Sequence, residues 1–241
     1  MMISNRLLSY VSLSTFMCVG GVAGGGAITH KLAGYNAALS FAKFGACMVL
    51  ALLLVQLILS LKGQKRAIYL ILFNMAFTFG IVVFMSCLIL PLFWVPAIES
   101  NVKLSLLLVS ASLWIVNIKR GIDIFNLRWT DAGGKLLLRY YRKQEREIDW
   151  NGILGSLKMS IAIYMPGVPE VLNPLVSILI VISMLAGLSL RSIFPEASLF
   201  AWGVPIIIVI SLIMQMVGFG IAQFLTLNSL EREAGAQIRP I

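Results

Sequence analysis

The sequence predicts an all-α membrane protein, a single bundle of about six transmembrane helices formed by residues 1–241. Composition and charge distribution predict this class. Hydrophobic residues make up 59% of the chain and its mean hydropathy is +0.94, well above the roughly half-apolar composition of soluble domains. Charged residues make up only 12% and gather between long apolar runs. A lipid-facing exterior is the environment that such a composition fits.

Six segments are apolar enough to cross a hydrocarbon core of about 30 Å, which takes about 20 residues of helix. They are residues 7–29, 38–61, 67–94, 102–118, 171–191 and 199–228. The fourth is the shortest, but Lys103 and Lys119 at its ends can extend their side chains to the two interfaces. The first is longer than the apolar part of a signal peptide and no cleavage site follows it, so we expect it to remain as a span.

Lysine and arginine residues predict the orientation, because loops rich in them stay in the cytoplasm. Fifteen of the 19 basic residues fall on one side of the six spans, and only four fall on the other. The basic side includes both chain ends and the long loop 119–170, so we expect an N-in/C-in topology. The net charge of +9 has the same explanation, and nucleic-acid binding is not expected. The bias favours a bacterial inner (plasma) membrane.

The cytoplasmic loop between the fourth and fifth spans is expected to contain amphipathic interfacial helices. A predicted helix over residues 135–148 carries leucines and tyrosines beside Arg139, Arg142, Lys143 and Arg146. This pattern is typical of a helix attracted to anionic lipid headgroups, although a solvated helix packed under the spans is the alternative. A second helix is expected within residues 151–166; it is too short to span and is either interfacial or re-entrant.

Glycines mark the expected helix-packing positions. Gly20 with Gly24 and Gly21 with Gly25 form two overlapping small-xxx-small registers in the first span, and Gly218 and Gly220 mark a similar place in the sixth. Such positions let a neighbouring helix backbone approach closely in lipid. The neighbour is either another span of this chain or a second protein.

Chemistry-bearing side chains are scarce inside the spans. All ten acidic residues lie in loops or the tail, which leaves no carboxylate for proton coupling or for a catalytic pair. Lys43 is near the outer end of its span, where it either extends to the interface or lines a polar cavity. The single histidine, His30, is expected at the outer interface. We expect no enzyme activity, metal or other cofactor.

Two roles are possible for the uncharged polar residues inside the spans. Such groups usually form hydrogen bonds between helices, and several facing one cavity would instead form a path for a substrate. They are Gln56, Asn74, Thr78, Ser86, Ser183, Gln215 and Gln223.

Two functional hypotheses follow from these features. The first is a non-enzymatic integral subunit of a larger inner-membrane assembly, of the secretion, conjugation, exclusion or immunity type. Its partners would be the lipid bilayer, anionic headgroups and other membrane proteins. The alternative is a passive transporter or channel for a small solute or a lipid, which would use the neutral polar residues and Lys43.

Overall fold

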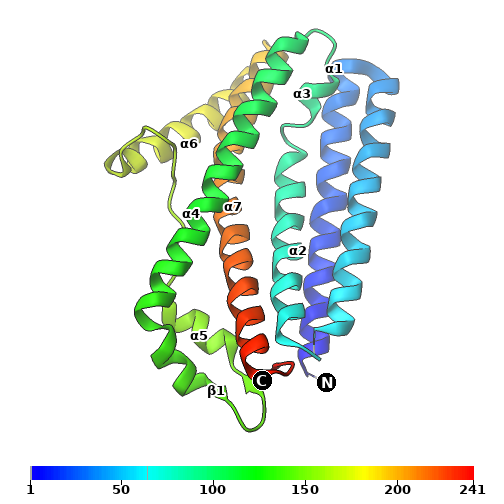
Figure 1. Cartoon of the computed structure of the whole chain (residues 1–241). Helices are drawn as coiled ribbons and strands as arrows, with labels where there is room; N and C mark the ends of the chain where they lie inside the picture. Colours follow the sequence, from blue (N-terminus) through cyan, green and yellow to red (C-terminus); the bar gives the residue numbers. More distant parts are fainter. Residues whose placement is uncertain (1, 64) are drawn as a thin grey trace.

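The computed structural model describes residues 2–63 and 65–241, with side chains from residue 7 onward apart from residue 64. It is all-α, with 81% of residues in helices, and five of the helices are long and apolar enough to cross a membrane. The predicted class, an integral membrane helix bundle, is therefore confirmed. Both termini lie at the same end of the bundle, which we call the termini end (Figure 1).

Helix α1 (Met2–Lys62) is a hairpin whose two arms run antiparallel (Figure 1). The chain reverses at Gly34, whose φ of 82° lies in the left-handed region that glycine adopts without strain. The arms pack closely, because a Cβ on Gly25 would collide with Phe41 and a Cβ on Gly45 with Val22. The predicted spans 7–29 and 38–61 fall one in each arm.

The third predicted span, 67–94, is interrupted. Helix α2 covers Ala67–Ser86 and the four-residue α3 covers Pro91–Trp94, with a turn between them. Pro91 has no N–H to donate to the carbonyl four residues back, and its ring would crowd that carbonyl, so an α-helix does not continue through it. The single helix expected over 67–94 is therefore wrong for its last eight residues.

Helix α4 (Ser100–Tyr140) contains the predicted span 102–118 and continues far into the segment expected to be a loop. The predicted separate helix over 135–148 is wrong. Residues 135–140 are the last turns of α4, and the remainder is a hairpin of β1 (Tyr141–Arg142) and β2 (Glu147–Ile148). Strand β3 (Arg239–Pro240), from the far end of the chain, pairs with β2 and completes a three-stranded sheet.

The predicted helix within 151–166 is correct only at its start. Helix α5 (Trp150–Leu157) ends where Lys158 adopts a left-handed conformation, with φ of 46°. Residues 158–169 have no regular secondary structure and run along α4 toward α6, passing no further helix before the short η1 (Glu170–Leu172) (Figure 1). The last two predicted spans correspond to α6 (Asn173–Leu190) and α7 (Pro195–Ala234).

Helix α7 is the central helix of the bundle. In the most apolar 18-residue stretch of α7, 61% of the residues are buried. In the corresponding stretch of α6, which lies on the outside of the bundle, only 6% are buried. Helices α4 and α7 cross closely at two glycines: a Cβ on Gly218 would collide with the Ile118 carbonyl and lie 3.0 Å from the Gly121 Cα atom. The sequence prediction of a close-packing position at Gly218 thus has its neighbour in α4.

A compact cap closes the termini end. Ile148 and Ile238 are fully buried there, and the tail donates hydrogen bonds from Arg239 N to Arg146 O (2.8 Å) and from Ile241 N to Ile148 O (3.1 Å). Glu231, on the last turn of α7, accepts hydrogen bonds from Arg66 Nε (3.1 and 2.9 Å) and from Ile238 N (3.0 Å). The bonds to Glu231 raise the pKa of the Arg66 guanidinium above its ordinary value.

Replacing Gly218 with alanine is expected to destabilise the bundle by about 1–3 kcal/mol, because the new methyl group meets α4 backbone that no side-chain rotation can move. The measurement is the thermal unfolding midpoint of the purified protein in detergent. Gly134→Ala, in α4 with open space around it, is the matched control and should be neutral or stabilising by up to about 1 kcal/mol. Equal midpoints for the two variants would contradict the close crossing.

Replacing Glu231 with alanine is expected to release the C-terminal tail, because Arg66 and the Ile238 N–H both lose their acceptor. We expect a loss of about 1–3 kcal/mol in the free energy of unfolding and faster carboxypeptidase removal of residues 236–241. The control is Glu233→Ala, which removes an exposed carboxylate from the same helix end. A tail that is digested equally fast in both variants would show that Glu231 does not hold it.

Candidate functional site

The two glycine registers of the first arm of α1 lie on neighbouring faces of the helix, about 100° apart, and have different surroundings. Gly21 and Gly25 are buried; a Cβ on Gly21 would lie 3.1 Å from the Phe84 ring, and one on Gly25 would collide with Phe41 and Cys87. Gly20 and Gly24 are exposed, and a Cβ on either would meet no atom within 4 Å. One register therefore packs inside the chain, while the other lies open on the surface of the bundle.

A shallow apolar groove of about 670 Å³ lies between the two arms of α1; Val19 and Ala23, the sequence neighbours of Gly20 and Gly24, line it, but the two glycines do not. Small residues line much of it, and they come from both arms: Ala23, Gly26, Ala38, Ala42 and Ala46. Among the described side chains of the first arm, His30 is the only ionisable one that lines it, near the turn of the hairpin. The groove could accommodate an apolar helix.

The other predicted positions are distributed over the surface and the core. Arg139, Arg142, Lys143 and Arg146 are all exposed at the termini end, although they lie on the end of α4 and on the β1–β2 hairpin and not on one helix. Lys43 is exposed on the second arm of α1 and lines none of the cavities described here. Gly220 packs against the side chain of Met75.

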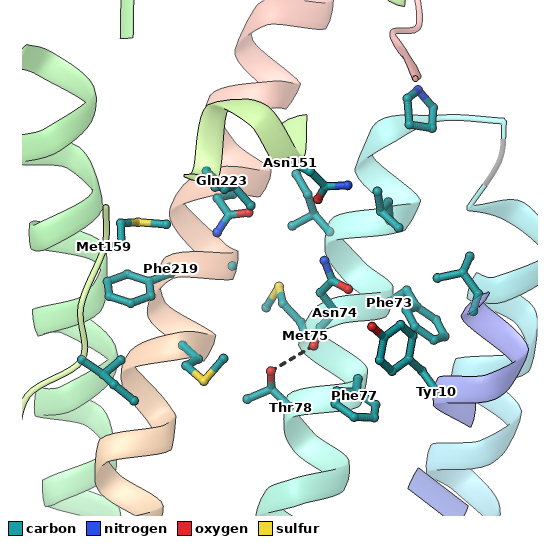
Figure 2. Close-up of a pocket in the computed structure, with 18 of the residues that line it drawn as sticks. Tyr10, Phe73, Asn74, Met75, Phe77, Thr78, Asn151, Met159, Phe219 and Gln223 are labelled. Carbon is teal, nitrogen blue, oxygen red and sulfur yellow. Dashed lines mark hydrogen bonds between the residues drawn. The ribbon is translucent and has the colours of Figure 1, made fainter. Parts of the chain in front are cut away.

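A larger cavity, of about 730 Å³, lies between α2 and α7 near the termini end; we call it the α2–α7 cavity (Figure 2). Apolar side chains form most of its wall, among them Leu70, Phe73, Met75, Leu154, Met216 and Phe219. Its polar side chains are all uncharged: Tyr10, Asn74, Thr78, Asn151 and Gln223. The sequence had singled out three of these, Asn74, Thr78 and Gln223, as polar residues within spans, and the structure brings them to one cavity.

The side-chain amide of Gln223, which lines the cavity, has a defined orientation. Its Oε1 accepts a hydrogen bond of 3.1 Å from the indole Nε1 of Trp150, on α5. An indole N–H can only donate, so the amide oxygen faces Trp150 and the NH₂ group points away from it; Figure 2 shows the nitrogen on the side of Gln223 away from Asn74. Only 8% of Gln223 is exposed, and its NH₂ group has no hydrogen-bond acceptor among the described side chains and backbone.

A second buried polar cluster holds the extended segment against the bundle. The Gln215 amide donates from Nε2 to Ala162 O (2.7 Å) and accepts at Oε1 from Ala162 N (3.3 Å), as a neighbouring strand would. Its Nε2 also donates to Asn117 Oδ1 (2.7 Å), and Asn117 Nδ2 donates to Tyr164 O (3.1 Å). Both side chains are fully buried. Sequence reasoning identified Gln215 but missed Asn117, whose position near the end of a span concealed its role.

Comparison with known proteins finds no match to this chain among protein families, characterised proteins or solved structures. Among the described residues, no group of three or more histidine, cysteine, aspartate or glutamate side chains is arranged to hold a metal ion.

Replacing Gln215 with leucine is expected to detach residues 158–169, because the Ala162 N–H and C=O would lose their partners in an apolar setting, at about 1–3 kcal/mol for each group. The measurement is hydrogen exchange of the segment, which should accelerate for residues 160–165. Asn126→Leu, at an exposed position of α4, is the control. Unchanged exchange in Gln215→Leu would show that other contacts hold the segment.

Proposed function

We propose that the protein is a non-enzymatic integral subunit of a larger assembly in a bacterial inner membrane. It crosses the membrane six times, with each arm of α1 forming one span and both termini in the cytoplasm. The observation that carries the proposal is the open face of α1, where Gly20 and Gly24 have no neighbour while the register beside them is fully packed.

This face has the character of a helix-docking surface. Helices in lipid gain no hydrophobic free energy by associating, so they associate where small residues let backbones approach and van der Waals contacts accumulate. Elsewhere on the same hairpin, many exposed positions carry large side chains such as Leu54, Leu57 and Leu61, as expected for surfaces that contact only lipid. The small residues at Gly20 and Gly24 and along the groove support contact with a helix instead.

The occupant that suits this face is an uncharged transmembrane helix of another protein. The groove offers almost no polar surface, so a helix with charged side chains would bury them without partners. The groove and the α2–α7 cavity share no lining residue, although α1 contributes to both, so a helix docked in the groove would leave the cavity free.

The termini end supports the orientation and a second contact with the membrane. Arg139, Arg142, Lys143 and Arg146 are exposed there, and of these only Arg142 forms an ion pair with a described residue, Glu145 at 3.2 Å. Each basic side chain near an anionic leaflet contributes about 1 kcal/mol of attraction. These residues are therefore available to anionic headgroups, or to an acidic segment of a partner.

A photoreactive amino acid at position 23, in the groove, is expected to form a discrete protein adduct in membranes of the source organism. The same probe at position 179, on the exposed face of α6, should give lipid adducts only. Gly20→Leu combined with Gly24→Leu should lower the protein adduct roughly tenfold, equivalent to about 1.4 kcal/mol of lost association. Both substitutions enter open space, so the fold should persist.

The matched control is Gly134→Leu, a substitution into equally open space on α4, which should leave the adduct unchanged. The mass of the complex in mild detergent provides an independent check. A stable monomer without a partner, together with lipid adducts alone at position 23, would refute the proposal.

A further inference from the structure

The α2–α7 cavity contains hydrogen-bonding groups that the protein itself leaves unused. Gln223 lines it from α7, and its NH₂ group bonds no described residue, while its amide oxygen accepts from Trp150. Figure 2 shows the Asn74 carboxamide on the opposite wall, on α2. The Asn74 side chain forms no hydrogen bond with any described residue; only its backbone carbonyl is engaged, by Thr78 at 3.0 Å.

Leaving such groups unpaired in an apolar setting is costly. An unpaired amide that water does not reach destabilises a protein by about 1–3 kcal/mol, which applies to Gln223, of which only 8% is exposed. The Asn74 side chain is exposed, so it bears this cost where lipid surrounds it, because lipid offers no hydrogen bonds. Hydrogen bonding between helices, the ordinary role of polar residues in spans, engages the Gln223 oxygen but accounts neither for the Gln223 NH₂ group nor for the Asn74 side chain, since these two bond no described residue. A ligand that accepts hydrogen bonds accounts for both.

The cavity is accessible from the side of the bundle at the depth of the acyl chains. Tyr10, Ile161 and Met216 line it and are each more than 40% exposed. Asn74 is seven residues beyond the start of α2, which places it about 10 Å along the helix from the termini end. A molecule dissolved in that leaflet can therefore enter without passing through water.

The lining determines the class of ligand. The walls are mainly apolar, and the volume of about 730 Å³ lies within the usual range of roughly 300–1,000 Å³ for small-molecule sites. No charged side chain lines the cavity among the described residues, so an ionised head group would be buried without a counter-charge. The free amide N–H groups require an acceptor, which a carbonyl oxygen supplies.

We propose that the α2–α7 cavity binds an uncharged lipid whose head group carries carbonyl oxygens, which accept hydrogen bonds from the amides of Gln223 and Asn74. The hydrocarbon chain lies against Phe73, Met75 and Phe219. Glycerol esters and isoprenoid quinones both supply this chemistry. The site does not depend on the α1 groove, so it stands whether or not the protein belongs to an assembly.

The experiment uses the full-length protein in nanodiscs with two diazirine probes, a diacylglycerol and a benzoquinone with an alkyl chain. We expect at least one probe to label peptides containing residues 70–78 or 216–223. Asn74→Leu should weaken this labelling about 3- to 10-fold, as the loss of one neutral hydrogen bond predicts. Because Asn74 bonds no described side chain, this variant should retain the fold, and Gln223→Leu should weaken labelling by at least as much.

Asn126→Leu, at an exposed amide outside the cavity, is the matched control and should label like the wild type. Labelling by the diacylglycerol alone identifies a glycerol ester as the ligand, and labelling by the quinone alone identifies a quinone. The proposal is overturned if neither probe labels the cavity peptides. It is also overturned if the three variants label equally, or if anionic phosphatidylglycerol competes as well as the unlabelled uncharged lipid.

Discussion

The amide of Gln215 is the group on which the arrangement of α4, α7 and the extended segment depends. An irregular backbone beside apolar helices needs every N–H and C=O satisfied, because lipid offers no hydrogen bonds. Gln215 lies at the middle of α7 and supplies one donor and one acceptor to Ala162, while Asn117 supplies a donor to Tyr164. The glycines Gly121 and Gly218 bring α4 close enough to α7 for Asn117 to reach Gln215.

The cap at the termini end joins the ends of several of these elements through one hydrophobic cluster. Residues from α2, the β1–β2 hairpin, α5, α7 and the tail form one buried cluster that includes Ile68, Trp150, Ile153 and Leu227. Trp150 belongs to this cluster and also orients Gln223, so the packing of the cap determines which end of that amide faces the α2–α7 cavity. A change in the cap would therefore alter the polarity of the cavity wall.

Small and polar residues in this chain divide between internal packing and exposed surfaces. Gln56 joins three helical segments by donating to Ser14 Oγ (2.9 Å) and to Ala76 O (3.0 Å), which is the packing role expected of it. Gly21 and Gly25 belong to the same interior. Asn74 and Gly24 lie outside these contacts, on the surfaces that we propose to bind a lipid and a partner helix.

The sequence alone determined the class of protein and the approximate positions of the apolar helices, because hydropathy is a local property that needs no knowledge of partners. It also identified Gln215, Gln223 and both glycine registers as unusual. Only the tertiary structure decided which register is buried, where residues 158–169 lie and how the tail closes the cap. These features depend on contacts between distant residues, such as Gln215 with Ala162, 53 residues away, and Arg66 with Glu231, 165 residues away. Local patterns therefore misassigned residues 135–148, since the strand that pairs with β2 comes from the end of the chain.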